Sequence, residues 1–242
     1  MPRKKKQTEA LSKELEDAWA KSAEAINIHL KGKRFSQKQR ELFKLATLAK
    51  TNIVFIGGPA GSAKTYLSVY SAMSLLCKNK DLDLLYVRTV IESADKGLGA
   101  LPGAIEEKFN PYMSPLLDKL EEMIPHTEIS ELMKTQRVSA VPINYLRGAS
   151  WRDKIVIADE AQNFTFKELT TLVTRIGEGT KLFICGDYMQ SDINGKSGFK
   201  EMVNLFSGDD CKENGIHVFN FNKDDIFRSK ILRFIIEKME SK

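Results

Sequence analysis

Short runs of branched apolar residues recur along the chain, separated by longer stretches in which apolar positions have helical spacing. A wholly apolar run of this length is typical of a strand buried on both faces of a parallel sheet. Five such runs occur, at residues 52–56, 83–90, 154–161, 181–187 and 216–222. Because most of the intervening stretches are helical in pattern, the sequence predicts an α/β fold with a mostly parallel, doubly wound sheet.

The ends of the chain and one long connection depart from this alternation. Residues 1–34 comprise a basic tail and an amphipathic stretch at 8–30, which predicts an N-terminal helix. Residues 35–242 are expected to form one domain that opens with a second helix at 37–50. The segment between the second and third strands is longer than a crossover needs, so a helical insertion is expected at about 91–140.

Composition narrows the class of protein. With 242 residues and 42% hydrophobic content, the chain can bury a substantial core. It has neither an apolar run long enough to span a membrane nor an N-terminal signal-peptide pattern, so a cytoplasmic protein without a membrane partner is expected. The three cysteines and three histidines show no clustered spacing, which argues against a disulfide framework or a metal centre built from them. The net charge of +5, partly in the tail PRKKK, is compatible with nucleic-acid contact.

The stretch GGPAGSAKTYLSVY, residues 57–70, follows the first apolar run and leads into a helical pattern. Strand, glycine-rich loop and helix in this order place backbone N–H groups and the positive end of a helix around a polyphosphate. Lys64 is expected to reach the β and γ phosphates of ATP, and the Thr65 hydroxyl is expected to ligate Mg²⁺. The predicted nucleotide-binding residues are Gly58, Pro59, Ala60, Gly61, Ser62, Ala63, Lys64, Thr65 and Tyr66.

Ala63 stands directly before this lysine, where the usual pattern has glycine. Because the chain enters a helix at this point, a right-handed backbone conformation is predicted, which alanine favours. We therefore interpret Ala63 as a permitted variant of a phosphate-binding loop. The alternative is a glycine-rich turn with only a structural role.

Two further motifs follow other predicted strands. Asp159 and Glu160 end the third strand, where Asp159 is expected to hold Mg²⁺ and Glu160 to orient or deprotonate the attacking water. Gln190, in Gly-Asp-x-x-Gln after the fourth strand, is expected to sense the γ phosphate. The combination resembles the core of superfamily one helicases, which read adenine with a glutamine upstream of the phosphate loop. Gln39 occupies the matching place, with Gln37 nearby.

Four blocks of the chain resemble, in the same order, those of the PhoH-like proteins, a family of phosphate-starvation-inducible ATPases, and the chain resembles a phage-encoded short form of that family. Two departures from the family pattern are Ala63 and Thr89, which follows Arg88 where proline is usual. Together the blocks span most of residues 35–235, and they read GPAGSAKTYLSVY, LGALPGAIEEKFNPYMSPLLDKL, PINYLRGASWRDKIVIADEAQNFTFKELTTLVTRIGEGTKLFICGDYMQSDI and DDIFRSKIL.

The resemblance implies a RecA-like P-loop domain, ATP hydrolysis, association with RNA or other single-stranded nucleic acid, and assembly into homo-oligomeric, hexameric rings. A superfamily one motor closes a cleft between two RecA-like domains. Since this chain has one, a neighbouring subunit is expected to supply an arginine to the transferring phosphoryl group, with Arg228 and Arg175 as candidates. Two alternatives stay open: a nucleotide-gated nucleic-acid-binding module with little turnover, and a ribonuclease-associated factor.

Basic and aromatic side chains offer phosphate contacts and stacking surfaces for a nucleic acid. The candidates outside the tail are Lys96, Lys108, Phe109, Tyr112, Arg137 and Arg147.

Overall fold

The computed structural model describes residues 27–89, 105–146, 150–190, 193 and 195–226, with backbone alone over 105–112. Within these ranges the strands are β1 (Ile53–Gly57), β2 (Asp83–Arg88), β3 (Val138–Pro142), β4 (Lys154–Ala158), β5 (Lys181–Gly186) and β6 (Ile216–Asn220). The α-helices are α2 (Gln37–Thr47), α3 (Lys64–Lys78), α4 (Ile105–Met123), α5 (His126–Lys134), α6 (Phe166–Val173), α7 (Phe199–Leu205) and α8 (Asp209–Glu213).

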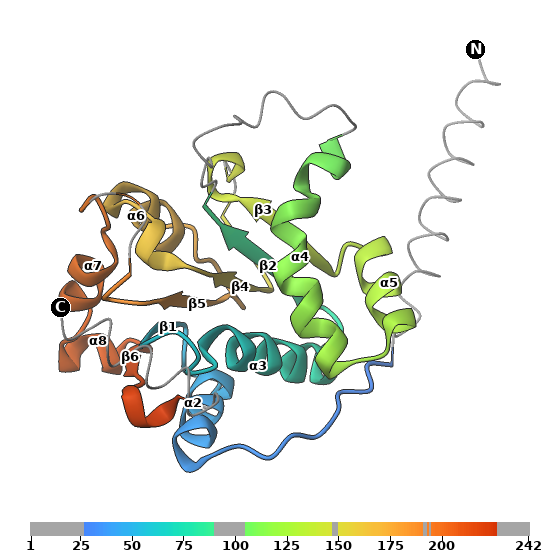
Figure 1. Ribbon diagram of the computed structural model, residues 1–242, viewed down its shortest axis with the longest axis horizontal. Helices are drawn as coiled ribbons and strands as arrows, with labels where there is room; N and C mark the ends of the chain where they lie inside the picture. The colour runs from blue at the N-terminus through green and yellow to red at the C-terminus, as the bar shows by residue number, and fades with distance from the viewer. Residues whose placement is uncertain (1–26, 90–104, 147–149, 191–192, 194, 227–242) are drawn as a thin grey trace, which may run out of the picture.

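The strands form one sheet in the order β3-β2-β4-β5-β1-β6, and every pairing between them is parallel. All carboxyl ends therefore lie at the same edge of the sheet, where ligands bind in open α/β folds. β5 lies between β1 and β4 (Figure 1). The predicted α/β fold with a doubly wound, parallel sheet is confirmed.

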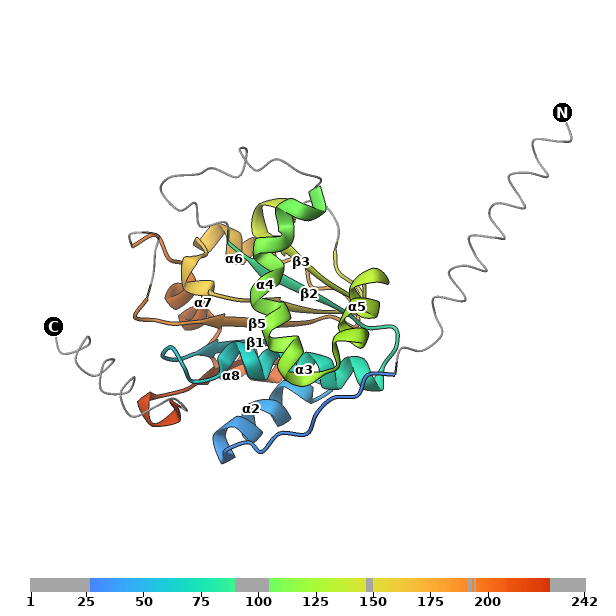
Figure 2. The ribbon, with the colours of Figure 1, turned by 45° about the vertical axis from the view of Figure 1, so that its right-hand side comes forward.

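Side chains alternate along each strand, so each face of the sheet has its own core. Val54 of β1 packs in one core with Leu67 of α3 and Leu116 of α4. Phe55, the next residue along β1, packs in the other core with Leu169 of α6. Figures 1 and 2 show the same division, with α3 and α4 on one side of the sheet and α6 and α7 on the other.

The edge strand β3 was missed by sequence reasoning. It begins at Val138, within the stretch interpreted as a helical insertion at about 91–140, and pairs with β2. Its burial alternates, and the small residues Ser139 and Ala140 occupy two of its five positions, so it lacks the continuous branched pattern of the other strands. Helices α4 and α5 occupy the rest of the described insertion.

The predicted N-terminal helix at 8–30 falls mainly outside the described residues. Residues 27–30 are not helical, so the prediction is wrong for its last turn. Ile28 and Leu30 pack against the α3–α4 core instead, and the Lys31 amide donates a hydrogen bond to the Met123 carbonyl at 2.8 Å. We call residues 27–36 the N-terminal strap. Across the described ranges, no helix has the length and apolar character needed to cross a bilayer.

Candidate active site

The segment of residues 57–65 contains the loop that joins β1 to α3 at the carboxyl edge of the sheet. Gly58 and Gly61 adopt φ values of 147° and 84°, which residues with side chains disfavour. α3 begins at Lys64, and no side chain caps its N-terminus. The first amides of a helix have no intrahelical acceptor, so this end is built to receive an anion.

Ala63 contradicts the sequence prediction. Its φ of 66° and ψ of 24° place it in the left-handed region, and it is the N-cap of α3, not its first helical residue. The prediction of a right-handed conformation is wrong because the chain is still completing the arch that begins at Gly61. A residue with a Cβ atom loses about 1–2 kcal/mol in this conformation.

Replacing Ala63 with glycine is expected to raise the free energy of unfolding by about 1 kcal/mol, because relief of the left-handed strain outweighs the extra freedom of glycine in the unfolded chain. In a chain of this size the gain corresponds to about 2–4 °C in Tm, measured by calorimetry. Ala46→Gly in the right-handed helix α2 is the control and should destabilise the protein. A lower Tm for Ala63→Gly would contradict the strain.

Lys64 folds back into the loop that precedes it. Its Nζ atom donates hydrogen bonds to the carbonyls of Gly58 at 2.7 Å and Pro59 at 2.9 Å. Burial lowers the pKa of the Lys64 ammonium, while nearby acids, with Asp187 first, act in the opposite direction. The loop thus holds a partly desolvated cation beside uncapped amides, where phosphate oxygens can replace the carbonyl partners.

Asp159 follows β4 and is 4% exposed. Its Oδ1 atom accepts a hydrogen bond from the Thr65 hydroxyl at 2.7 Å, and its Oδ2 atom accepts one from the Tyr86 hydroxyl at 2.5 Å. Burial, and then the charge of Asp159, raise the pKa of Tyr86, so this hydroxyl stays a donor. The carboxylate is therefore fixed at both oxygens and directed toward the start of α3.

Glu160 adopts a left-handed backbone, with φ of 55° and ψ of 43°, a conformation that is costly for a non-glycine residue and recurs at functional sites. Its Oε1 atom lies 3.6 Å from Arg88 Nη2. Gln162 donates to Glu160 Oε2 at 2.6 Å and accepts from the Asp187 amide at 3.0 Å. Gln162 therefore connects the Glu160 carboxylate to the end of β5.

Sequence reasoning did not assign roles to Tyr86, Arg88, Gln162 or Asp187. Gln162 and Asp187 lie inside the quoted motifs Asp-Glu-Ala-Gln and Gly-Asp-x-x-Gln, so their positions gave a usable signal. Tyr86 gave none, because its contact with Asp159 depends on the pairing of β2 with β4.

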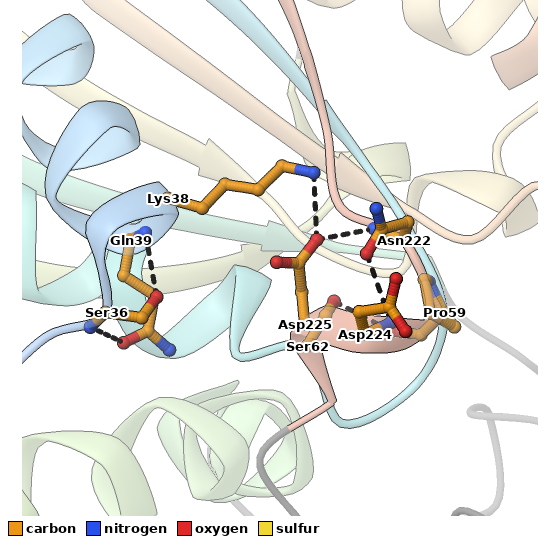
Figure 3. Close-up of polar contacts among 8 residues, drawn as sticks. All are labelled: Ser36, Lys38, Gln39, Pro59, Ser62, Asn222, Asp224 and Asp225. Carbon is orange, nitrogen blue, oxygen red and sulfur yellow. Dashed lines mark hydrogen bonds and ion pairs between the residues drawn. The ribbon is translucent and has the colours of Figure 1, made fainter.

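A pocket of about 610 Å³ opens over the loop, within the size range of small-molecule sites. Arg88, Gln162 and Asp187 line it, together with residues of the N-terminal strap and of α4. The predicted site residues that line it are Gln39, Ala60, Gly61, Ala63, Lys64, Thr65, Tyr66, Asp159, Glu160 and Gln190. Gly58, Pro59 and Ser62 are not among the lining residues. Ser62 is buried and donates to the Pro59 carbonyl at 2.8 Å, so it shapes the loop from inside (Figure 3).

Of Gln37 and Gln39, the two candidate readers of adenine, Gln39 reaches the pocket. Its side-chain Oε1 atom accepts from the Ser36 backbone amide at 3.0 Å, and the Gln39 backbone amide donates to the Ser36 hydroxyl at 3.2 Å, which caps α2 (Figure 3). A side-chain amide has a second oxygen lone pair and two N–H donors, so this cap leaves capacity to read a base. Gln37 instead bonds to Glu41 at the surface and does not line the pocket.

The segment after β6 connects the loop to α2. The Phe221 amide donates to the Gly57 carbonyl at 2.8 Å, at the start of the phosphate-loop candidate. Asp225 accepts from the backbone amide of Asn222 at 2.8 Å and pairs with Lys38 of α2 at 2.9 Å, as Figure 3 shows. Residues 221–226 therefore link the end of β1 to α2.

Of the two arginines expected to act from a neighbouring subunit, Arg175 lies within the described residues. Arg175 follows α6 and does not line the pocket. Arg228 lies outside the described residues, and both assignments stay predictions. Arg137 donates to the Leu82 carbonyl at 2.9 Å, which gives it a structural role. Lys96 and Arg147 also lie outside the described residues, as do the side chains of Lys108, Phe109 and Tyr112.

The donor set at the loop suits a hard divalent cation held jointly with a phosphate. Mg²⁺ in nucleotide sites takes one or two protein oxygens together with phosphate oxygens and water. The Thr65 hydroxyl and the Asp159 carboxylate are such oxygens, and they meet at 2.7 Å. No group of three His, Cys, Asp or Glu residues that could hold a metal alone occurs in the part of the chain that the structure describes.

The fold and the pocket define the class: this is a P-loop NTPase, in which a lysine-bearing loop after β1 faces an acid pair at the end of β4. A family model described as PhoH-like protein matches residues 31–240, and the chain belongs to that family. The resemblance inferred from the motifs, and with it the RecA-like class of fold, is thereby confirmed.

Curated relatives agree. The chain is 34% identical over 233 residues to a PhoH-like protein of Bacillus subtilis, covering 94% of this chain and 71% of the relative. It is 32% identical over 213 residues to a PhoH-like protein of Synechocystis sp., covering 87% and 62%. It is 30% identical over 200 residues to Protein PhoH of Escherichia coli, covering 81% and 55%. The chain thus spans between about half and seven tenths of these relatives.

Solved structures with similar coordinates include the Pif1 helicase from Candida albicans, with a TM-score of 0.41 and 20% identity over 85% of this chain and 43% of that one. A Bacteroides sp Pif1 in complex with ADP-AlF4 has a TM-score of 0.39 and 19% identity, covering 85% and 45%.

Proposed function

We propose that the chain is a magnesium-dependent ATPase that acts on single-stranded RNA from a homo-oligomeric, hexameric ring in the cytoplasm. One observation supports the ATPase most directly. The Thr65 hydroxyl and the Asp159 carboxylate contact each other at 2.7 Å, beside the uncapped start of α3 and the partly buried Lys64 cation. This arrangement combines an anion site with a pair of hard oxygen ligands, as hydrolysis of a Mg²⁺-bound triphosphate requires.

In this mechanism the loop amides and Lys64 bind the β and γ phosphates. Thr65 and Asp159 would hold Mg²⁺, which when bound neutralises charge on the phosphates. Glu160 orients the attacking water and accepts its proton, and its carboxylate is positioned by Arg88 and Gln162. Gln190, at the exposed rim of the pocket, reports the loss of the γ phosphate.

The nucleic-acid partner and the ring rest on less direct support. The net charge of +5 favours a polyanion, and the family resemblance favours RNA. The sheet forms a single RecA-like unit, so strand movement requires a second unit from another subunit.

The test measures phosphate release from ATP by the purified chain, with and without Mg²⁺ and with and without a single-stranded RNA, while its assembled mass is recorded. Release that stops on chelation and rises with RNA supports the proposal. Binding of ATP without release supports instead a nucleotide-gated binding module, and ATP-independent shortening of labelled RNA would indicate ribonuclease activity. DNA in place of RNA, at several salt concentrations, tests the choice of partner.

A further inference from the structure

An aromatic side chain lines the pocket beside the start of α3. Tyr66 follows Thr65 directly in the first turn of α3, and it lines the pocket together with Gln39, the predicted base reader. Tyr66 is thus the next residue in the chain after Lys64 and Thr65, which are expected to bind the phosphates and Mg²⁺. Aromatic rings stack on nucleobases of every kind, because every base has a π face.

A cation from the N-terminal strap covers this ring. Lys33 Nζ lies 3.9 Å from the centre of the Tyr66 ring, which is the height at which a stacked base would lie. Glu122 of α4 pairs with Lys33 at 3.6 Å and with Lys119 at 3.4 Å. Glu122 of α4, a helix separate from the phosphate loop, thus holds Lys33 over the Tyr66 ring.

α4 has one set of side chains in the core and another in the pocket. Its apolar side chains at Leu116, Leu120 and Met123 are buried in the core. The adjacent stripe of Pro115, Asp118, Lys119 and Glu122, spaced by three or four residues, lines the pocket. α4 therefore packs into the core with its apolar side chains and lines the pocket with the adjacent ones, three of which are charged.

We propose that the Tyr66 ring is the platform on which the nucleobase of ATP stacks, and that Lys33, held by Glu122, is a gate that the base displaces. The inference rests on the proposed nucleotide site and deepens it, because it assigns the base subsite to α3, α4 and the N-terminal strap. The ligand class is a nucleoside polyphosphate, and the part recognised here is the base.

The experiment compares a ligand that has a base with one that lacks it. Dissociation constants of ADP and of pyrophosphate are measured by calorimetry, by competition where binding is weak, and their ratio isolates the base. Tyr66→Leu is expected to weaken ADP relative to pyrophosphate by about 5-fold or more, and Tyr66→Phe to preserve the ratio. Lys33→Met is expected to favour ADP relative to pyrophosphate by about 2- to 5-fold, since the base no longer competes with a cation.

Lys31→Met is the matched control, because Lys31 is exposed, lies in the same strap and does not line the pocket. It removes the same charge and should leave the ratio unchanged. An unchanged ratio in either Tyr66→Leu or Lys33→Met overturns the proposal. If Lys64→Ala fails to weaken both ligands, the proposed nucleotide site itself is wrong, and the two failures are thereby distinguished.

Discussion

Glu160→Gln is expected to reduce phosphate release by about 10²- to 10⁴-fold while ATP still binds, because the amide keeps the size of the side chain but cannot accept the proton of water. Glu160 lies at the end of β4 with Arg88 on one oxygen and Gln162 on the other. Single-turnover hydrolysis and equilibrium ATP binding, measured on the same preparation, separate the chemical step from affinity.

Glu178→Gln provides the control for this change. The Glu178 side chain is 83% exposed and pairs only loosely with Arg152, at 3.8 Å. The Glu178→Gln variant should hydrolyse ATP at the wild-type rate. Equal rates for Glu160→Gln and wild type would remove Glu160 from the catalytic step.

Lys64→Ala is expected to lower turnover by about 10²- to 10³-fold and to weaken ATP binding as well, since a preorganised cation at the transferring phosphoryl group is lost. The structure adds a pH dependence. Burial lowers the pKa of Lys64, and phosphates bind its charged form. ATP affinity should therefore be retained below this lowered pKa and fall as the pH rises through it, and Lys64→Ala should lack that step.

Lys78→Ala is the matched control, because Lys78 is exposed in the last turn of the same helix, far from its phosphate-binding end. Its turnover and its affinity for ATP should match the wild type. Phosphate release by Lys64→Ala at the wild-type rate would contradict the assignment of the loop.

The strands that form the centre of the sheet could be predicted because their residues meet only apolar surroundings. β1, β4 and β5 are buried nearly throughout, and their branched residues produce continuous apolar runs. β3 lies at the edge, so only alternate residues are buried, and its pattern resembles that of an irregular segment. The contribution of α4 to the pocket could likewise not be predicted from the local sequence pattern, because the position of this helix depends on its packing against the core.

The residues of the site also differ in whether the sequence alone predicts them. Lys64, Thr65, Asp159 and Glu160 are readable because motif spacing fixes which residues end a strand or begin a helix. Their partners depend on register between strands that are distant in the sequence, as when Tyr86 of β2 reaches Asp159 after β4. Helix propensity gave a wrong prediction at Ala63. Alanine favours the right-handed conformation, but the geometry of the arch places the Ala63 backbone in the left-handed region.

The conformation of Ala63 has a consequence for the recognition of such sites across genomes. The loop keeps its backbone conformation although alanine disfavours the left-handed region at position 63. Glycine at this position would therefore change the energy of the loop more than its backbone conformation. A search pattern that demands glycine there would pass over this chain. Patterns anchored on Lys64-Thr65 and on the acids after β4 would retain it, because those residues form the contacts from which the pocket is built.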